Sequence, residues 1–180
     1  LPGDYGIGSF GQAAYDFVDF LKETKQTYWQ ILPLTTTSYG DSPYQSFSAV
    51  AGNTHFIDLD FLIRDKFLTK ADVKDADFGT DPEFIDYAKV YERRPILEKA
   101  VKAILADKKE TKRFEAFKTK NANWLADYAD FMAIKEHFDN KALQDWDDKK
   151  AVKRDEATLE KLRKELADVI TYHQVVQYLF

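Results

Sequence analysis

A segment of tyrosines and short polar side chains at residues 39–48 is the part of the sequence best suited to bind a ligand. It reads Tyr-Gly-Asp-Ser-Pro-Tyr-Gln-Ser-Phe-Ser. Aromatic rings stack on the CH faces of a sugar, while hydroxyl, amide and carboxylate groups exchange hydrogen bonds with its hydroxyls. The glycine and the proline favour a loop. The residue types alone therefore make carbohydrate binding a reasonable hypothesis.

A glycine pattern near the start suggests a different chemistry. Gly6, Gly8 and Gly11 match the dinucleotide-binding pattern Gly-x-Gly-x-x-Gly. That motif needs a strand just before it and an acidic residue ~20 positions later, which holds the ribose. The corresponding position here falls in the apolar run at residues 28–34. We therefore favour turns that lead into a helix, and keep nucleotide binding as the lesser alternative.

Acidic and histidine side chains are candidate metal ligands. On a strand, Asp58 and Asp60 would face the same side, as a metal-dependent glycosyltransferase would require. The same spacing also fits acids that end a strand or cap the next helix. The three histidines show no ligand spacing and are expected to be structural: His55, His137 and His173. We predict no metal site and no cofactor.

Composition and charge exclude several classes of protein. The absence of cysteine excludes disulfides and thiolate metal sites, and no apolar run approaches the ~20 residues that span a bilayer. The net charge of -5 argues against nucleic acid as a partner. Residues 1–61 hold two basic and seven acidic side chains, so this charge excess lies in the first third. We expect a cytoplasmic protein with no nucleic-acid or membrane partner.

The elements that must position the polar loop are predicted from hydrophobic periodicity. Ser9 and Gln12 have the spacing of a capping box, and a helix is predicted over residues 11–24. The apolar run at residues 28–34 predicts a strand buried on both faces, as in a parallel sheet. Residues 35–55 are then a long loop at the carboxyl end of that strand, where α/β folds place their sites.

From about residue 62 the sequence changes to Lys, Glu, Asp, Ala and Leu at helical spacing. Apolar stripes predict amphipathic helices over residues 92–107, 124–138 and 155–180. The last stripe could be a coiled-coil seam, but it falls short of the ~3 to 4 heptads that such an assignment requires. We favour a helical subdomain that ends in a core helix.

The sequence resembles glycoside hydrolase family 77, the amylomaltases and disproportionating enzymes. The likeness is carried by Leu-Pro and Tyr-Gly-Ile-Gly near the start, by Tyr-Trp-Gln-Ile-Leu-Pro-Leu at 28–34, and by GDSPYQSFSAVAGN at 40–53. Further matches are Asp86, Tyr87 and Tyr91, with segments in residues 124–133 and 173–180. The resemblance therefore spans the whole chain.

The resemblance implies an α/β fold, in which this chain forms the opening units of a (β/α)8 TIM barrel with a mainly helical inserted subdomain. Residues 1–61 would start the catalytic barrel and carry the substrate-binding loop 35–55. Residues 62–154 would form the inserted subdomain, and residues 155–180 would be a helix returning to the barrel.

The reaction implied is that of a 4-alpha-glucanotransferase, which transfers a segment of an α-1,4-glucan to the 4-hydroxyl of an acceptor glucan or glucose. Its retaining double displacement needs two carboxyl groups about 5 to 5.5 Å apart. In this family the carboxylates come from later barrel strands, and no segment here matches those strands. We therefore expect an N-terminal fragment that contains no catalytic residue and has no activity alone.

Substrate-binding residues do carry over from the resemblance. Tyr44 matches the tyrosine that lies against the sugar next to the scissile bond, with Ser42 on the same wall. Asp41 and Gln45 are expected as weaker neighbours, and the partners are maltodextrin and a glucose acceptor. Two more residues match tyrosines that hold glucan at a second groove in some members: Tyr39 and Tyr91. The alternative for these aromatics is ordinary packing or surface exposure.

Two other functions stay open at this point. The chain could be a non-catalytic carbohydrate-binding or helical interaction module, or part of a hydrolase related to the α-amylases. An open part of a barrel would expose strand edges and apolar faces, so the fragment is also expected to associate with itself or with the rest of the protein.

Overall fold

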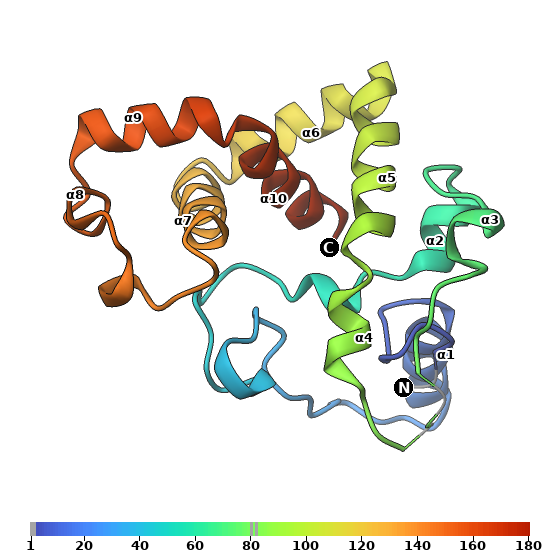
Figure 1. Ribbon diagram of the computed structural model, residues 1–180. Coiled ribbons are helices and arrows are strands. Elements are labelled where there is room, and N and C mark those ends of the chain that lie inside the picture. Colours follow the sequence, from blue (N-terminus) through green and yellow to red (C-terminus); the bar gives the residue numbers. More distant parts are fainter. Residues whose placement is uncertain (1–2, 80, 82) are drawn as a thin grey trace. The chain divides into compact units, whose positions relative to one another are not determined.

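The computed structural model describes residues 3–79, 81 and 83–180, without the side chain of Tyr39. It is mainly helical (Figure 1), and contains no β-strand within these residues. The chain divides into two compact units, residues 1–111 with 179–180, and residues 112–178. In the described part, no helix is long and apolar enough to cross a membrane.

Within its described residues, the first unit carries the polar loop and seven helical elements. In order these are α1 (Gln12–Glu23), η1 (Tyr39–Asp41), η2 (Thr54–Phe56), α2 (Leu59–Arg64), α3 (Lys70–Val73), α4 (Tyr87–Tyr91) and α5 (Arg94–Ala106). The second unit contains most of α6 (Lys108–Lys120) and α10 (Ala167–Leu179). Between them lie α7 (Leu125–His137), η3 (Leu143–Asp145), α8 (Lys149–Val152) and α9 (Glu156–Glu165).

Helix α1 confirms the predicted helix over residues 11–24, but the predicted capping box is wrong. Its N-cap is Gly11, which makes no side-chain cap. The Ser9 hydroxyl donates instead to Asp58 Oδ2 at 2.5 Å, and the Gln12 amide donates to Asp16 Oδ1 at 2.8 Å. Ser9 stands two residues before the N-cap, so its side chain meets Asp58 and not the first turn of the helix.

The glycines at the start serve close packing. A Cβ on Gly11 would lie 1.9 Å from Asp58 Oδ2. Gly6 has a φ of +80°, and a Cβ there would lie 2.5 Å from the Phe78 carbonyl oxygen. Asp58 also caps α2, because its Oδ1 accepts the Phe61 N–H at 2.9 Å. These contacts support the turn interpretation of the glycines, and confirm the capping alternative for Asp58.

The strand predicted over residues 28–34 is wrong for this structure. The run has no regular secondary structure, and Tyr28 and Leu32 are 89% and 60% exposed. Backbone pairing starts at its end, where the Leu34 carbonyl accepts the Asn53 N–H at 2.8 Å and Thr35 forms an isolated antiparallel bridge with Gly52. A strand needs peptide groups of neighbouring strands along its length, and an apolar sequence does not supply them.

The predicted helices at residues 92–107 and 124–138 are confirmed by α5 and α7. The continuous helix predicted over residues 155–180 is wrong, because the chain bends at Leu166 between α9 and α10. The turn is nearly helical, since the Leu166 N–H still donates to the Leu162 carbonyl at 2.8 Å. Leu166 packs against the buried cluster of the second unit, so tertiary packing decides where the long stripe bends.

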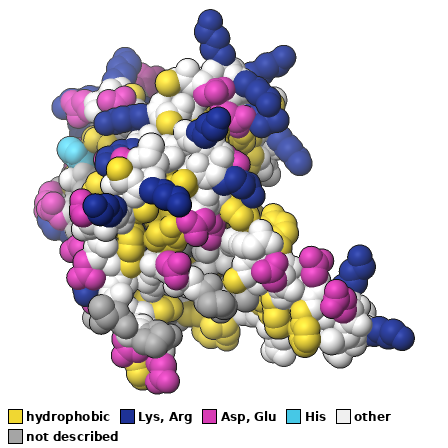
Figure 2. Space-filling view, turned by 90° about the vertical axis from the view of Figure 1, so that its right-hand side faces the viewer, with side chains coloured by type: hydrophobic (Ala, Val, Ile, Leu, Met, Phe, Trp, Pro, Cys, Tyr) yellow, Lys and Arg dark blue, Asp and Glu magenta, His cyan; other side chains and the backbone are white. Residues whose placement is uncertain are grey.

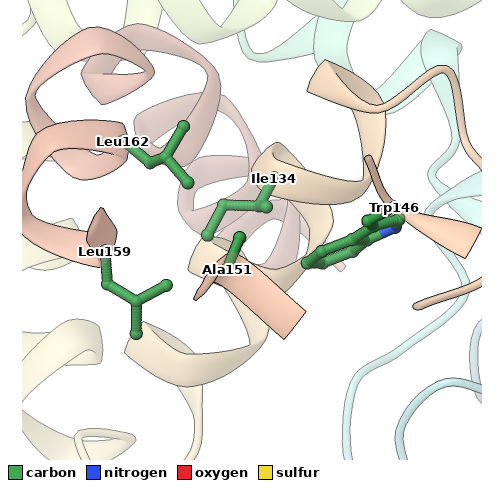
Figure 3. Close-up of a cluster of buried hydrophobic side chains, with 5 residues drawn as sticks. All are labelled: Ile134, Trp146, Ala151, Leu159 and Leu162. Atoms are coloured by element: carbon green, nitrogen blue, oxygen red, sulfur yellow. The ribbon is translucent and has the colours of Figure 1, made fainter. Parts of the chain in front are cut away.

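That buried cluster gives the second unit a core of its own. It consists of Ile134, Trp146, Ala151, Leu159 and Leu162 (Figure 3). The Trp146 ring stacks on two further rings, with centroids 5.9 Å from Phe131 and 5.1 Å from Phe138. Its indole N–H donates to the Lys141 carbonyl at 3.2 Å, so the polar edge of this ring is also satisfied.

Candidate functional site

The loop predicted at residues 35–55 is present, and short hydroxyl side chains organise its second half. The hydroxyls of Thr36 and Ser46 are 3.1 Å apart, and Ser46 donates to the Ser48 carbonyl at 2.7 Å. The Ser48 hydroxyl accepts the Ala51 N–H at 3.0 Å. These local bonds hold a segment that has little regular structure of its own.

The tip of the loop presents Tyr44 to solvent. Gly40 and Asp41 both have left-handed backbone conformations, with φ of +73° and +55°. A turn follows, in which the Ser42 hydroxyl accepts the Tyr44 N–H at 3.3 Å and the Ser42 carbonyl accepts the Gln45 N–H at 3.2 Å. Tyr44 is 74% exposed, so its ring is available to stack on a ligand.

Asp41 and Tyr91, which the resemblance assigned to two different glucan sites, are joined in the structure. The Tyr91 hydroxyl donates to Asp41 Oδ1 across 50 residues of sequence. Partial burial, followed by this bond to a carboxylate, raises the pKa of Tyr91 to about 12, so the phenol stays a donor at neutral pH. Tyr91 is still 51% exposed. The side chain of Tyr39, the other residue predicted for the second groove, lies outside the described residues.

A buried arginine fixes the element that carries Tyr91. Arg93 is 2% exposed and donates to the carbonyls of His55 at 2.8 Å and Ile57 at 2.7 Å. It thereby ties the end of α4 to η2. Arg93 is not among the residues predicted from the sequence. A signal for it is present, because Arg93 and Arg94 stand before an apolar helical stripe, at a helix start where the helix dipole would favour acidic residues.

His55 lies between the loop and α4. Its ring packs edge-on against Tyr91, with centroids 5.1 Å apart and planes at 79°. Burial lowers the pKa of His55 to about 4, assisted by the positive charge of Arg93 and opposed by Asp41. His55 is therefore neutral at pH 7 and acts as a packing group, in keeping with the structural role expected for it.

A cavity of about 370 Å³ opens next to the loop within the first unit. Its walls include Trp29, Ile31 and Leu32 from the predicted strand, together with Asp41 from the loop and Tyr87 from α4. The lining is largely apolar, so Asp41 lies at a boundary between the polar loop and a hydrophobic hollow. Tyr44 lies outside the cavity lining and points its ring into solvent.

Three acids of the first unit accept hydroxyl hydrogen bonds from other parts of the unit. Asp41 receives the Tyr91 hydroxyl, Asp58 receives that of Ser9, and Asp60 Oδ1 receives the Tyr5 hydroxyl at 2.5 Å. No group of three or more acidic or histidine side chains capable of holding a metal ion occurs within the described residues. What the arrangement offers is an exposed aromatic ring on a polar, internally bonded loop.

Comparison with known proteins gives matches over the whole chain. The family model described as 4-alpha-glucanotransferase matches residues 1–180. A 4-alpha-glucanotransferase from Streptococcus pneumoniae serotype 4 is 59% identical and aligns with 100% of this chain, but with 36% of its own length. One from Thermus thermophilus is 40% identical, also over 100% of this chain and over 35% of its own length.

A solved structure matches this chain over its full length. The amylomaltase from Streptococcus agalactiae in complex with acarbose is 58% identical, and superposes with a TM-score of 0.96 over 100% of this chain and 36% of that protein. The chain thus spans just over a third of the length of the relatives described.

Proposed function

The chain belongs to the 4-alpha-glucanotransferase family, glycoside hydrolase family 77, and we propose that it forms the N-terminal, glucan-binding part of a 4-alpha-glucanotransferase. The observation that carries this proposal is the 58% identity and TM-score of 0.96 to an amylomaltase bound to acarbose, over the full chain. The polar loop and its exposed Tyr44 lie within the matched region.

The proposed reaction is a retaining double displacement on a maltodextrin. One carboxylate attacks the anomeric carbon while a second carboxylic acid protonates the departing sugar chain. The second group, now a base, then takes the proton of the 4-hydroxyl of a glucan or glucose as that oxygen displaces the first carboxylate. By family resemblance the nucleophile and the acid/base come from later barrel strands, which no segment of this chain matches, so both are assigned to sequence outside this chain. The chain's own contribution is to grip and orient the donor sugar.

Within the loop, we assign Tyr44 to the sugar next to the scissile bond and Ser42 to the same wall. Gln45 and Asp41 are their neighbours. The exposure of Tyr44 and the backbone bonds of the turn at residues 42–45 support this assignment, because the ring is held out from the loop while its backbone is fixed. Tyr91, and Tyr39 by resemblance, are assigned to a second glucan-binding groove.

The proposed fold of the complete enzyme is a (β/α)8 barrel, of which this chain supplies the opening units and a mainly helical insertion. Residues 1–61 start the barrel, residues 62–154 form the insertion, and residues 155–180 return to the barrel. The exposed Tyr28, Ile31 and Leu32 support this proposal, because a buried barrel strand would carry apolar side chains of this kind.

The test is the reaction of maltotriose with the 180-residue chain and with the full-length protein. We expect glucose together with longer maltodextrins from the full-length protein, and no products from the chain alone. Glucose and maltose without longer products would indicate a hydrolase. Absence of any product from the full-length protein, with retained maltodextrin binding, would replace the proposal with a non-catalytic binding module.

A further inference from the structure

We propose that the hydrogen bond between Tyr91 and Asp41 is a latch that couples the loop tip to α4. Asp41 is then a positioning residue, which acts on the sugar site through the backbone turn that carries Tyr44. This inference rests on the proposed function and deepens it, because it links the two glucan-binding sites that were assigned separately.

The α4 side of the latch is firmly held. Val90 is almost completely buried, and Arg93 at the end of the helix clamps the carbonyls of His55 and Ile57. The Tyr91 ring packs against His55 at a centroid distance of 5.1 Å. The Tyr91 hydroxyl is therefore presented from a fixed position on a rigid support.

The loop side has little support of its own at this point. Gly40 and Asp41 adopt successive left-handed conformations, and space around the Gly40 Cα is open, so backbone conformation rather than crowding is the reason for glycine there. The Asp41 N–H donates to the Ser38 carbonyl at 3.0 Å, and the turn with Tyr44 begins at the next residue. Fixing the Asp41 carboxylate therefore fixes the direction in which the turn projects Tyr44.

The latch also connects the second groove to the first site. The Tyr91 ring is half exposed, so a glucan that stacks on it touches the residue whose hydroxyl holds Asp41. A glucan at Tyr91 that strengthens or weakens this bond changes the conformations available to the loop, and so changes the affinity for glucan at the Tyr44 site. By thermodynamic linkage, a glucan at the Tyr44 site must change the affinity at the Tyr91 site by the same factor.

The experiment compares Tyr91→Phe, Asp41→Asn and the double variant. Tyr91→Phe keeps the ring and removes the hydroxyl, and Asp41→Asn keeps the shape and removes the charge. In the full-length enzyme we expect Tyr91→Phe to raise KM for maltotriose about fivefold with kcat nearly unchanged, as for loss of one charge-assisted hydrogen bond, and Asp41→Asn to raise it less, because the amide oxygen still accepts the hydroxyl. The double variant should be no worse than Tyr91→Phe, because that change already removes the hydroxyl that residue 41 accepts.

Tyr15→Phe on α1 is the matched control, since it removes a tyrosine hydroxyl from an exposed residue outside the loop and α4. In the 180-residue chain, hydrogen exchange at the backbone N–H groups of Ser42, Tyr44 and Gln45 should be faster in Tyr91→Phe than in the parent and unchanged in Tyr15→Phe. This second measurement does not depend on catalysis.

The outcomes separate the latch from the proposed function. Additive effects in the double variant, or parent-like KM and exchange in Tyr91→Phe, would overturn the latch while transfer by the parent enzyme stands. Faster loop exchange with no transfer by the full-length parent would overturn the proposed function and leave the mechanical coupling intact.

Discussion

The carboxylate of Asp58 organises the start of the molecule with both of its oxygens. One oxygen caps α2 through the Phe61 N–H, and the other receives the Ser9 hydroxyl. Gly11 passes so close to this carboxylate that a Cβ would collide with it. In the glycine pattern that resembles a nucleotide-binding motif, Gly11 is therefore explained by packing against this part-buried acid–hydroxyl contact, and Gly6 by its positive φ and its close approach to Phe78.

Tyr44 is the residue on which the proposed sugar contact depends. Replacing it with Ala should lower kcat/KM for maltotriose in the full-length enzyme about tenfold or more, because the stacking surface is lost, while Phe should retain most of the activity. Steady-state kinetics measures both. Since Tyr44 is 74% exposed, the unfolding midpoint should not change. Equal activity of the Ala variant and the parent would remove Tyr44 from the site.

His55 should make folding stability depend on pH. Its pKa is about 4 in the folded protein, against an ordinary value of 6.5, so between these values the unfolded chain binds more protons. The contribution of neutral His55 to the free energy of unfolding is fully present above pH 6.5 and is lost as the pH falls towards 4. Over this range the free energy of unfolding should fall by on the order of 2 kcal/mol through His55 alone.

Denaturant unfolding of the parent and of His55→Gln at pH 7 and pH 4.5 checks this prediction. Between pH 7 and pH 4.5, the free energy of unfolding should fall less in the variant than in the parent. The effect of the carboxylates is common to both proteins, so it cancels in the comparison. Parallel curves would show that His55 is protonated as easily in the folded state as in the unfolded one.

At the scale of elements, the second unit depends on the aromatic stack around Trp146. The cluster joins Ile134 of α7, Trp146 just after η3, Ala151 of α8, and Leu159 and Leu162 of α9 (Figure 3). Phe131 of α7 stacks on Trp146, and Leu166, where the C-terminal stripe bends, packs against the same cluster.

Replacing Trp146 with Ala should therefore destabilise this unit by about 3 to 5 kcal/mol, since a buried ring and its stacking partners are lost. Chemical denaturation followed by far-UV circular dichroism would measure the loss. Leu143→Ala in the neighbouring η3 is the control, because Leu143 is largely exposed and should change stability little. A Trp146→Ala protein as stable as the control would contradict the proposed core.

At the scale of the whole molecule, exposed apolar side chains distinguish this chain from a self-sufficient domain. Figure 2 shows hydrophobic side chains gathered at several places on one face, between acidic and basic ones. Among the exposed large residues are Tyr28, Ile31 and Leu32 in the predicted strand. An exposed apolar run such as residues 28–34 favours association.

We therefore expect the isolated 180-residue chain to associate with itself in a concentration-dependent manner, as light scattering or sedimentation would detect. The double substitution of Ile31 and Leu32 by Lys should lower the association, because charges oppose burial of this run. Val50→Lys, at an exposed position in the loop, is the matched control. A monomer at all concentrations would contradict the expectation.

The sequence by itself determined the features that depend on near neighbours. The spacing of apolar side chains predicted α1, α5 and α7 correctly, because helical hydrogen bonds join residues four apart. The concentration of tyrosines and short polar groups at residues 39–48 identified the loop, and carbohydrate binding remains a prediction for it. Family resemblance, carried by motifs along the whole chain, supplied the proposed reaction.

Tertiary structure alone decided the contacts between distant residues. Ser9 bonds to Asp58 across 49 positions and Tyr91 to Asp41 across 50, so neither pair has a periodicity that a local pattern could reveal. The apolar run at residues 28–34 is exposed and irregular for the same reason, since a strand is defined by partners and not by its own side chains. Helices satisfy their hydrogen bonds locally, whereas strands and contacts such as Tyr91–Asp41 need residues brought together by the fold.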